Sequence, residues 1–113
     1  MNTATLTVEG CEILLDQDDC LCDLNDWSES VAQALAVREG IELSEAHWEV
    51  LYLLRKFYQT FQLSPANRAL VKYVAVHLGK EKGNSLYLNA LFNGKPAKLA
   101  ARLAGLPKPA NCF

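Results

Sequence analysis

Residues that begin and end helices recur along the chain after its first 25 positions. Asp26 or Ser28 can cap a helix that runs to about Glu39, and Gly40 then stops it. Ser44 opens the next segment, which we expect to be the central core helix because its apolar residues recur at helical spacing. Those apolar residues are Val50, Leu54, Phe57, Tyr58 and Phe61.

Further helices are predicted in the second half of the chain. Ser64-Pro65 is a start signal in which the hydroxyl caps the helix and the proline takes its first position, and Gly79 ends the segment. A polar turn over residues 80–85 leads to a short helix, and a last helix ends at Gly105. The expected buried faces are Leu70, Tyr73, Val74 and His77, then Leu88, Leu91 and Phe92, then Pro96, Leu99, Ala100 and Leu103.

A β-hairpin is predicted ahead of these helices. Leu6 and Val8 alternate with threonines, Gly10 interrupts the pattern, and Ile13 and Leu15 alternate again. At 113 residues the chain is long enough for one domain with its own core, so we expect a single domain over 1–113. The predicted fold class is mostly α, a helical bundle with a small N-terminal hairpin and an extended C-terminal arm.

The expected arm covers about 105–113 and carries a cysteine, Cys112, next to its end. A thiol at that position has no core to fill, so chemistry explains it better than packing does. Pro107 and Pro109 favour an extended backbone, and seven residues at about 3.1 Å each would give a reach of roughly 20 Å. Such an arm can hand a group from one protein to another.

Charge is distributed unevenly along the chain although its net value is only −2. Residues 1–63 hold twelve acids and three bases, whereas residues 64–113 hold one acid and eight bases. Lys95, Lys98 and Arg102 follow one another at i, i+3 and i+7, which places them on one face of the last helix. With Lys108 in the arm, these three residues, the basic stripe, predict a surface that binds an anionic partner.

Neither a membrane span nor a secretion signal is apparent, so we expect the cytoplasm, where Cys11, Cys20, Cys22 and Cys112 would be free thiols. A thiolate metal site at the first three cysteines is conceivable. Their spacing is unlike that of zinc sites, and small apolar side chains at half-buried positions explain them better. We therefore expect no metal and no cofactor.

A DNA-binding regulator is the alternative from another class of function. Residues 65–92 read as helix, polar turn and helix, with basic side chains along them, which is compatible with a helix-turn-helix. Against it stand the net charge of −2 and the isoelectric point near 5.6, because stable duplex binding needs many phosphate contacts. Strong salt-dependent retardation of nucleic acid would indicate this alternative.

Several motifs occur in the order and at the spacing of one family of small sulfur-carrier proteins, and with them the chain resembles the DsrC/TusE family over nearly its whole length. The motifs are Leu24-Asn25-Asp26-Trp27, Leu43-Ser44-Glu45-Ala46-His47-Trp48, Ser64-Pro65-Ala66-Asn67-Arg68, Gly79-Lys80-Glu81-Lys82-Gly83-Asn84-Ser85 and Ala104-Gly105-Leu106-Pro107-Lys108-Pro109, followed by the penultimate Cys112.

The resemblance implies a helical bundle with an N-terminal hairpin, and a persulfide sulfur carried on Cys112. DsrC-type members have a second cysteine eleven residues earlier, where this chain has Ala101, so the chain resembles the TusE type. That type implies a sulfurtransferase that accepts sulfur from the TusBCD complex and delivers it to the thiouridylase MnmA for 2-thiolation of the tRNA wobble uridine. DsrC-like sulfur trafficking remains an alternative.

Sulfur exchange requires a thiolate at Cys112. An unperturbed thiol with a pKa near 8.5 is only about 3% ionised at pH 7, so positive charge nearby would help. Lys108 and Arg102 are the candidates in the sequence, while the carboxylate of Phe113 opposes them. Activation can therefore be completed by the site of the partner.

Overall fold

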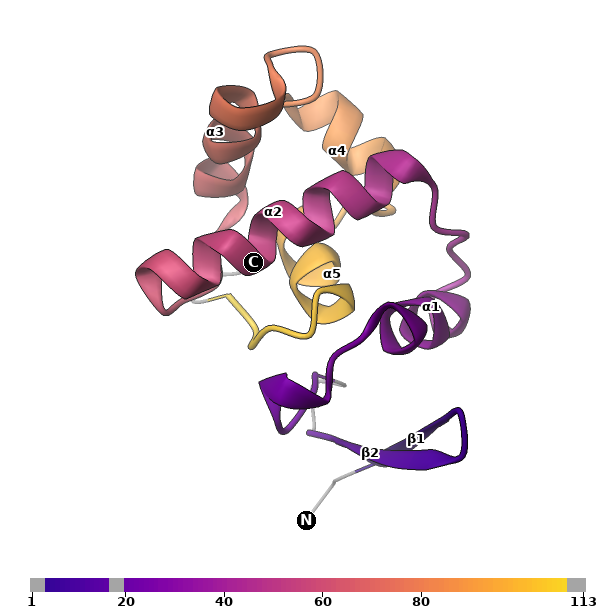
Figure 1. Ribbon diagram of the computed structural model, residues 1–113. Helices are drawn as coiled ribbons and strands as arrows, with labels where there is room; N and C mark the ends of the chain where they lie inside the picture. The colour runs from indigo at the N-terminus through magenta and orange to yellow at the C-terminus, as the bar shows by residue number, and fades with distance from the viewer. Residues whose placement is uncertain (1–3, 17–19, 110–113) are drawn as a thin grey trace.

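A computed structural model describes residues 4–16 and 20–109, and Cys112 lies outside them (Figure 1). Within these ranges the chain forms a hairpin followed by helices, as the sequence predicts. The elements are β1 (Ala4–Val8), β2 (Cys11–Leu15), the short 3-10 helix η1 (Leu24–Asp26), α1 (Glu29–Arg38), α2 (Glu45–Phe61), α3 (Asn67–Leu78), α4 (Ser85–Leu91) and α5 (Pro96–Leu103).

The hairpin predicted from the period-2 pattern is confirmed. β1 and β2 pair antiparallel with Leu6 opposite Ile13, and both of these side chains are buried together with Leu15. The two-residue turn places Glu9 at φ 51° and Gly10 at φ 81°. Positive φ at both positions is the form of tight turn that matches the twist of the strands it joins.

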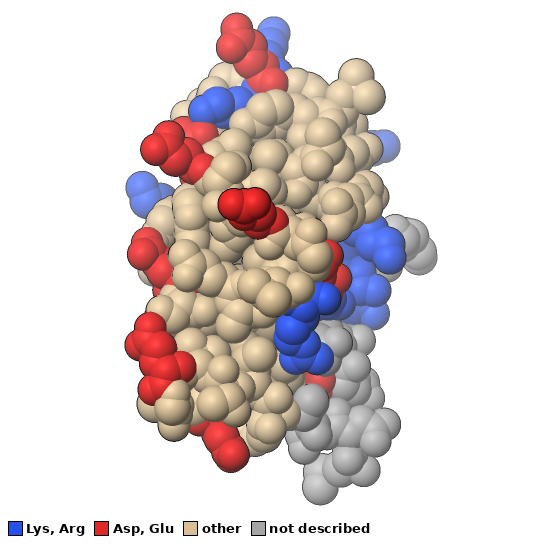
Figure 2. Space-filling model, turned by 90° about the vertical axis from the view of Figure 1, so that its right-hand side faces the viewer, with Lys and Arg blue, Asp and Glu red and all other residues tan. Residues whose placement is uncertain are grey.

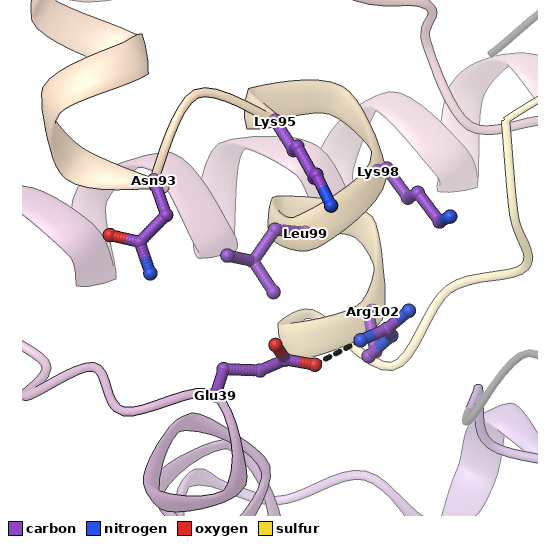
Figure 3. A pocket seen from close by; sticks show the side chains of 6 residues that line it. All are labelled: Glu39, Asn93, Lys95, Lys98, Leu99 and Arg102. Atoms are coloured by element: carbon purple, nitrogen blue, oxygen red, sulfur yellow. Dashed lines mark hydrogen bonds and ion pairs between the residues drawn. The ribbon is translucent and has the colours of Figure 1, made fainter. Parts of the chain in front are cut away.

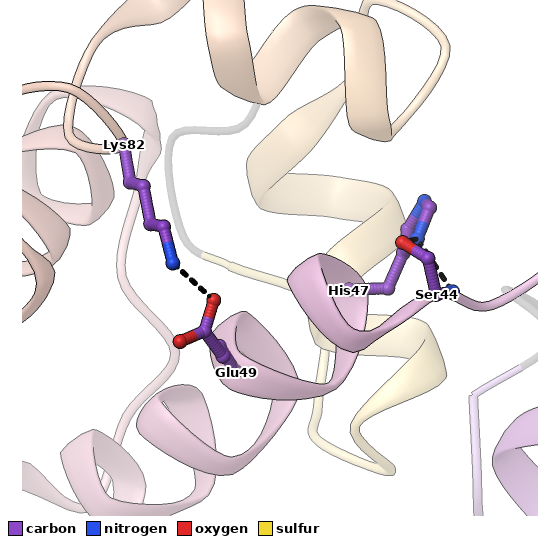
Figure 4. Close-up of polar contacts among 4 residues, drawn as sticks. All are labelled: Ser44, His47, Glu49 and Lys82. Atoms are coloured by element: carbon purple, nitrogen blue, oxygen red, sulfur yellow. Dashed lines mark hydrogen bonds and ion pairs between the residues drawn. The ribbon is translucent and has the colours of Figure 1, made fainter.

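Serines are the N-cap residues of the first two long helices. The Ser28 hydroxyl accepts a hydrogen bond from the Val31 amide at 3.2 Å, so Ser28 and not Asp26 caps α1. At the start of α2 the Ser44 amide donates to Nδ1 of His47 at 3.0 Å (Figure 4). Because Nδ1 accepts this bond, Nε2 of the neutral ring carries the proton and donates to the Leu91 carbonyl at 2.8 Å. Buried His47 thereby ties the start of α2 to the end of α4.

The most central helix is α5, not α2 as the sequence suggested. α5 contacts α1, α2, α3 and α4, and Figure 1 shows it in the middle of the molecule behind α2. α2 packs one face on this centre and exposes about half of the Phe61 side chain, 51%. The buried residues of α5 are Pro96, Ala97, Leu99, Ala100, Ala101 and Leu103.

The predicted cap at Ser64-Pro65 is wrong. α3 begins at Asn67, and the Ser64 hydroxyl donates instead to the Pro107 carbonyl at 2.6 Å. The Asn67 side chain accepts from the Ala97 amide at 2.9 Å, which fixes the start of α5 against the start of α3. His77, expected on the buried face of α3, is exposed.

The polar turn between α3 and α4 is fixed to α2 by an ion pair. The Lys82 ammonium donates to the Glu49 carboxylate at 2.6 Å, and this hydrogen bond raises the pKa of Lys82 (Figure 4). Gly83 packs so closely on α3 that an added Cβ would lie 2.2 Å from the Ala75 backbone. Lys82, one of the basic side chains along residues 65–92, is therefore already paired with an acid of the same chain at the surface.

The two histidines of the chain give a matched test of the His47 contacts. His47→Ala leaves the Ser44 amide and the Leu91 carbonyl without these partners and opens a cavity beside Phe92. We expect a loss of about 2–4 kcal/mol in the free energy of unfolding, measured by urea denaturation. His77→Ala removes an exposed ring and should change it by about 0.5 kcal/mol or less. Equal losses in the two variants would contradict this account.

Candidate functional site

The base of the arm is held by a tight approach at Gly105. This residue has φ 76°, and a Cβ built on it would lie 2.5 Å from Cδ1 of Trp27. Only glycine meets both conditions, since side chains are disfavoured at positive φ and the indole leaves no space. Trp27 comes from the segment before α1, so two parts of the chain that are far apart in the sequence meet here.

Two side chains far away in sequence satisfy the carbonyls at the end of α5. The indole N–H of Trp27 donates to the Leu103 carbonyl at 2.8 Å, and Nη1 of Arg55 donates to the Ala104 carbonyl at 2.6 Å. The Arg55 guanidinium also lies over the Trp27 ring, 4.3 Å from its centroid. A cation is favourable at this end of a helix because the helix dipole places partial negative charge there.

Arg55 is partly removed from water in this position. Burial lowers the pKa of Arg55, and the interaction with Tyr52 acts in the opposite direction. The Tyr52 hydroxyl donates to the Glu29 carboxylate, which raises the pKa of Tyr52. An arginine retains its charge through such a shift, so Arg55 acts as a fixed cation beneath the arm.

The next residues stay against the body instead of leaving it. The Leu106 amide donates to the Ala101 carbonyl at 2.9 Å, the Leu106 side chain is 2% exposed, and Pro109 is buried. Between Leu106 and Pro109, the Pro107 carbonyl accepts a hydrogen bond from the Ser64 hydroxyl. We call Trp27, Arg55 and Ser64 the clamp. The arm expected to extend freely over about 105–113 is thus docked as far as Pro109.

The basic stripe is assembled as its spacing predicts. Lys95, Lys98 and Arg102 line one pocket along α5 (Figure 3). Their surroundings differ, because Lys95 is exposed whereas Arg102 is largely buried and forms an ion pair with Glu39 at the end of α1. Lys108 is exposed on the docked segment. The pairing with Glu39 could not be read from the spacing of the stripe.

Charged side chains are unevenly distributed over the face drawn in Figure 2. Acidic side chains follow its left-hand edge, with some Lys and Arg among them at the upper left and top, and a further group of Lys and Arg lies on the right-hand side. Much of the surface between these edges is uncharged.

The described cysteines occupy different environments. Cys20 is buried and 3% exposed, as expected for a small apolar side chain, whereas Cys11 and Cys22 are exposed and not half-buried. Ala101, at the position of the missing second arm cysteine, is completely buried in α5. Cys112 lies outside the described residues, so its role stays a prediction at this point.

The clamp residues were missed as functional candidates. In the sequence, Trp27 was noted only as part of a motif, and Ser64 only as part of a motif and as a helix cap. A usable signal was Gly105 directly after a helix, since it marks a sharp change of direction at the base of the arm. Its partners come from more distant parts of the chain and leave no local pattern.

A small helical body that fixes the base of a C-terminal segment, beside a cluster of cations, suits a carrier protein. The family of DsrC like proteins matches residues 7–113, and the chain belongs to this family. A protein of Haemophilus influenzae named as a sulfurtransferase TusE homolog is 52% identical over 108 residues, covering 96% of this chain and 99% of that protein. Sulfurtransferase TusE of Pectobacterium atrosepticum is equally similar over the same shares.

Solved structures of the family have the same fold. The NMR structure of Allochromatium vinosum DsrC matches with a TM-score of 0.90 at 46% identity, covering 99% of this chain and 100% of that one. The oxidized gamma-subunit of the dissimilatory sulfite reductase from Archaeoglobus fulgidus gives 0.83 at 39% identity, covering 97% and 100%. The chain is a sulfur-transfer protein of this family. Within residues 4–16 and 20–109, no helix is long and apolar enough to cross a membrane.

Alanine variants of two glycines with similar φ angles can distinguish the cost of the clash at Trp27 from the cost of backbone strain. Gly94→Ala places a Cβ in open space at φ 81° and should cost about 1 kcal/mol of unfolding free energy. Gly105→Ala adds the collision with Trp27, so we expect a loss larger by about 2 kcal/mol or more. Urea denaturation of both variants measures the difference. Similar losses would show that Trp27 moves away without cost.

Proposed function

We propose that Cys112 carries a persulfide sulfur from a TusBCD-type donor complex to an MnmA-type tRNA thiouridylase in the cytoplasm. Its final use would be 2-thiolation of the wobble uridine. The observation that supports this most strongly is the similarity to sulfurtransferases named TusE, which extends over 96% of this chain and 99% of the relative. The absence of a cysteine at Ala101 supports the TusE type over the DsrC type.

The transfer consists of two exchanges that balance without an oxidant. The Cys112 thiolate attacks the outer sulfur of the donor persulfide, a new S–S bond forms, and the donor cysteine leaves as a thiolate. Cys112 now bears the transferable sulfur. A thiolate of the acceptor attacks that outer sulfur in turn, and Cys112 leaves as a thiolate.

The clamp limits how far this sulfur can travel. Cys112 is three residues beyond Pro109, so a fully extended chain would span only about 10 Å from there. This is about half the reach of roughly 20 Å expected for a free arm. A partner must therefore approach the body itself around Lys108. The clamp residues act as positioning residues for the transfer, while the basic stripe and Lys108 face the partner.

The assignment of sulfur to Cys112 is tested by replacing the thiols separately. Cys112→Ser should abolish sulfur acceptance without changing the thermal midpoint. A variant with Cys11→Ser, Cys20→Ala and Cys22→Ser should still accept one sulfur, with alanine used at the buried position to avoid an unpaired hydroxyl. Mass spectrometry after incubation with a cysteine desulfurase and the TusBCD complex measures the added sulfur. A folded triple variant that accepts none would overturn the assignment.

The positioning role of the clamp is tested at Arg55. Arg55→Gln weakens the hold on the Ala104 carbonyl and removes the cation over Trp27. We expect protein-to-protein sulfur transfer to slow about ten-fold or more, because misplacing reacting groups by an ångström is that costly. Alkylation of Cys112 by a small reagent should hardly change. The neighbouring exposed Lys56→Gln is the matched control, and a transfer rate for Arg55→Gln equal to that of the control would exclude the role.

A further inference from the structure

The pocket along α5 is enclosed by residues from two parts of the chain. Its volume is about 230 Å³, and it lies between α5, the turn before it and the end of α1. Figure 3 shows the Lys95 side chain extending in the direction of Arg102, and the Glu39 side chain reaching Arg102 from the end of α1. The lining residues are Glu39, Asn93, Lys95, Lys98, Leu99 and Arg102.

The charges of the lining residues do not balance. Lys95, Lys98 and Arg102 contribute three positive charges, and Glu39 contributes the one negative charge of the lining. The difference of +2 is concentrated in a concave space, where walls of low dielectric strengthen the field. A group with two negative charges would neutralise it.

Arg102 is incompletely hydrogen-bonded in this state. Its Nη1 contacts one oxygen of Glu39. The Arg102 side chain is 16% exposed and the Glu39 side chain 32%. Its Nε is buried and has no hydrogen-bond partner among the described residues. An unsatisfied buried N–H is costly, and an arginine fork is suited to an oxyanion that accepts from Nε and a terminal nitrogen together.

We propose that this pocket binds a phosphate group, held by Arg102 with Lys95 and Lys98, and that Glu39 is its built-in competitor. A tetrahedral phosphate can offer one oxygen to each side of the arginine fork and others to the lysines, which one carboxylate oxygen of Glu39 does not do. The group can be a free phosphate monoester or a phosphate of an RNA backbone. Asn93, at the rim, offers an amide donor.

The site deepens the proposed function, because it gives the partner-facing stripe a defined ligand, but it does not require that function. Phosphate binding involves no thiol. Measuring it on the Cys112→Ser variant therefore separates the two proposals: a failure to bind phosphate leaves sulfur transfer untouched, and a failure of sulfur transfer leaves this site untouched.

The test is an NMR titration of ¹⁵N-labelled Cys112→Ser protein with inorganic phosphate, compared with sodium chloride at equal ionic strength. We expect saturable amide shifts that are confined to residues 93–102 and the neighbourhood of Glu39. They should be seen with phosphate and not with sodium chloride. A short single-stranded RNA is the second ligand. Saturation of the same shifts at lower RNA concentration identifies the RNA backbone as the source, and shifts with phosphate alone identify a free phosphate.

Three variants connect these shifts to the pocket. Glu39→Gln keeps an acceptor for Arg102 but removes the competing charge, so phosphate should bind about three-fold more tightly. Lys95→Gln with Lys98→Gln should weaken binding by a similar factor or more. The exposed pair Lys56→Gln with Lys80→Gln, outside the pocket, is the matched control and should bind like the parent.

Three results would overturn the proposal. Shifts spread over Lys56 and Lys72 as well as the pocket would indicate charge screening only. Unchanged affinity in Glu39→Gln and in the Lys95 and Lys98 double variant would exclude the pocket as the site. Tighter binding of an oligoglutamate peptide than of both phosphate ligands would show that the pocket selects carboxylates of an acidic protein.

Discussion

Burial of α5 is the constraint on which the rest of the structure depends. Ala97, Ala100 and Ala101 are at most 1% exposed, and side chains this small let the surrounding helices pack close to the α5 backbone. A short helix enclosed in this way has few routes to satisfy the carbonyls of its last turn. Trp27 and Arg55 supply donors, so the packing of the core and the hold on the arm are parts of one arrangement.

The clamp holds the chain up to Pro109 against the body. In the proposed function, the position at which Cys112 meets a partner would then be set by the body and only a few further residues. Fixing the base reduces the conformational entropy lost when a partner binds. Specificity can then reside in the surface around Lys108 and α5, which both partners of a relay would share.

The electrostatic character of that surface depends on one acidic residue. Glu39 pairs with Arg102, and among the described residues the pocket lining holds no second acid for the other two cations of the basic stripe, Lys95 and Lys98. Competition between an internal carboxylate and an external oxyanion for the same guanidinium lets the pocket bind its ligand reversibly. Glu39 reduces the positive charge of the pocket lining but leaves it with an excess of two positive charges.

The sequence by itself determined the hairpin, the helix start at Ser44 and the shared face of the basic stripe, because these depend on residues within a few positions of one another. Its motifs also determined the family. The sequence left Asp26 and Ser28 as alternative caps of α1, and the structure selected Ser28. Only the tertiary structure decided that α5 is central, that Ser64 holds Pro107 and that Glu39 pairs with Arg102. Those last two contacts join residues 43 and 63 positions apart, and the Trp27 bond to Leu103 spans 76, so no local periodicity records them.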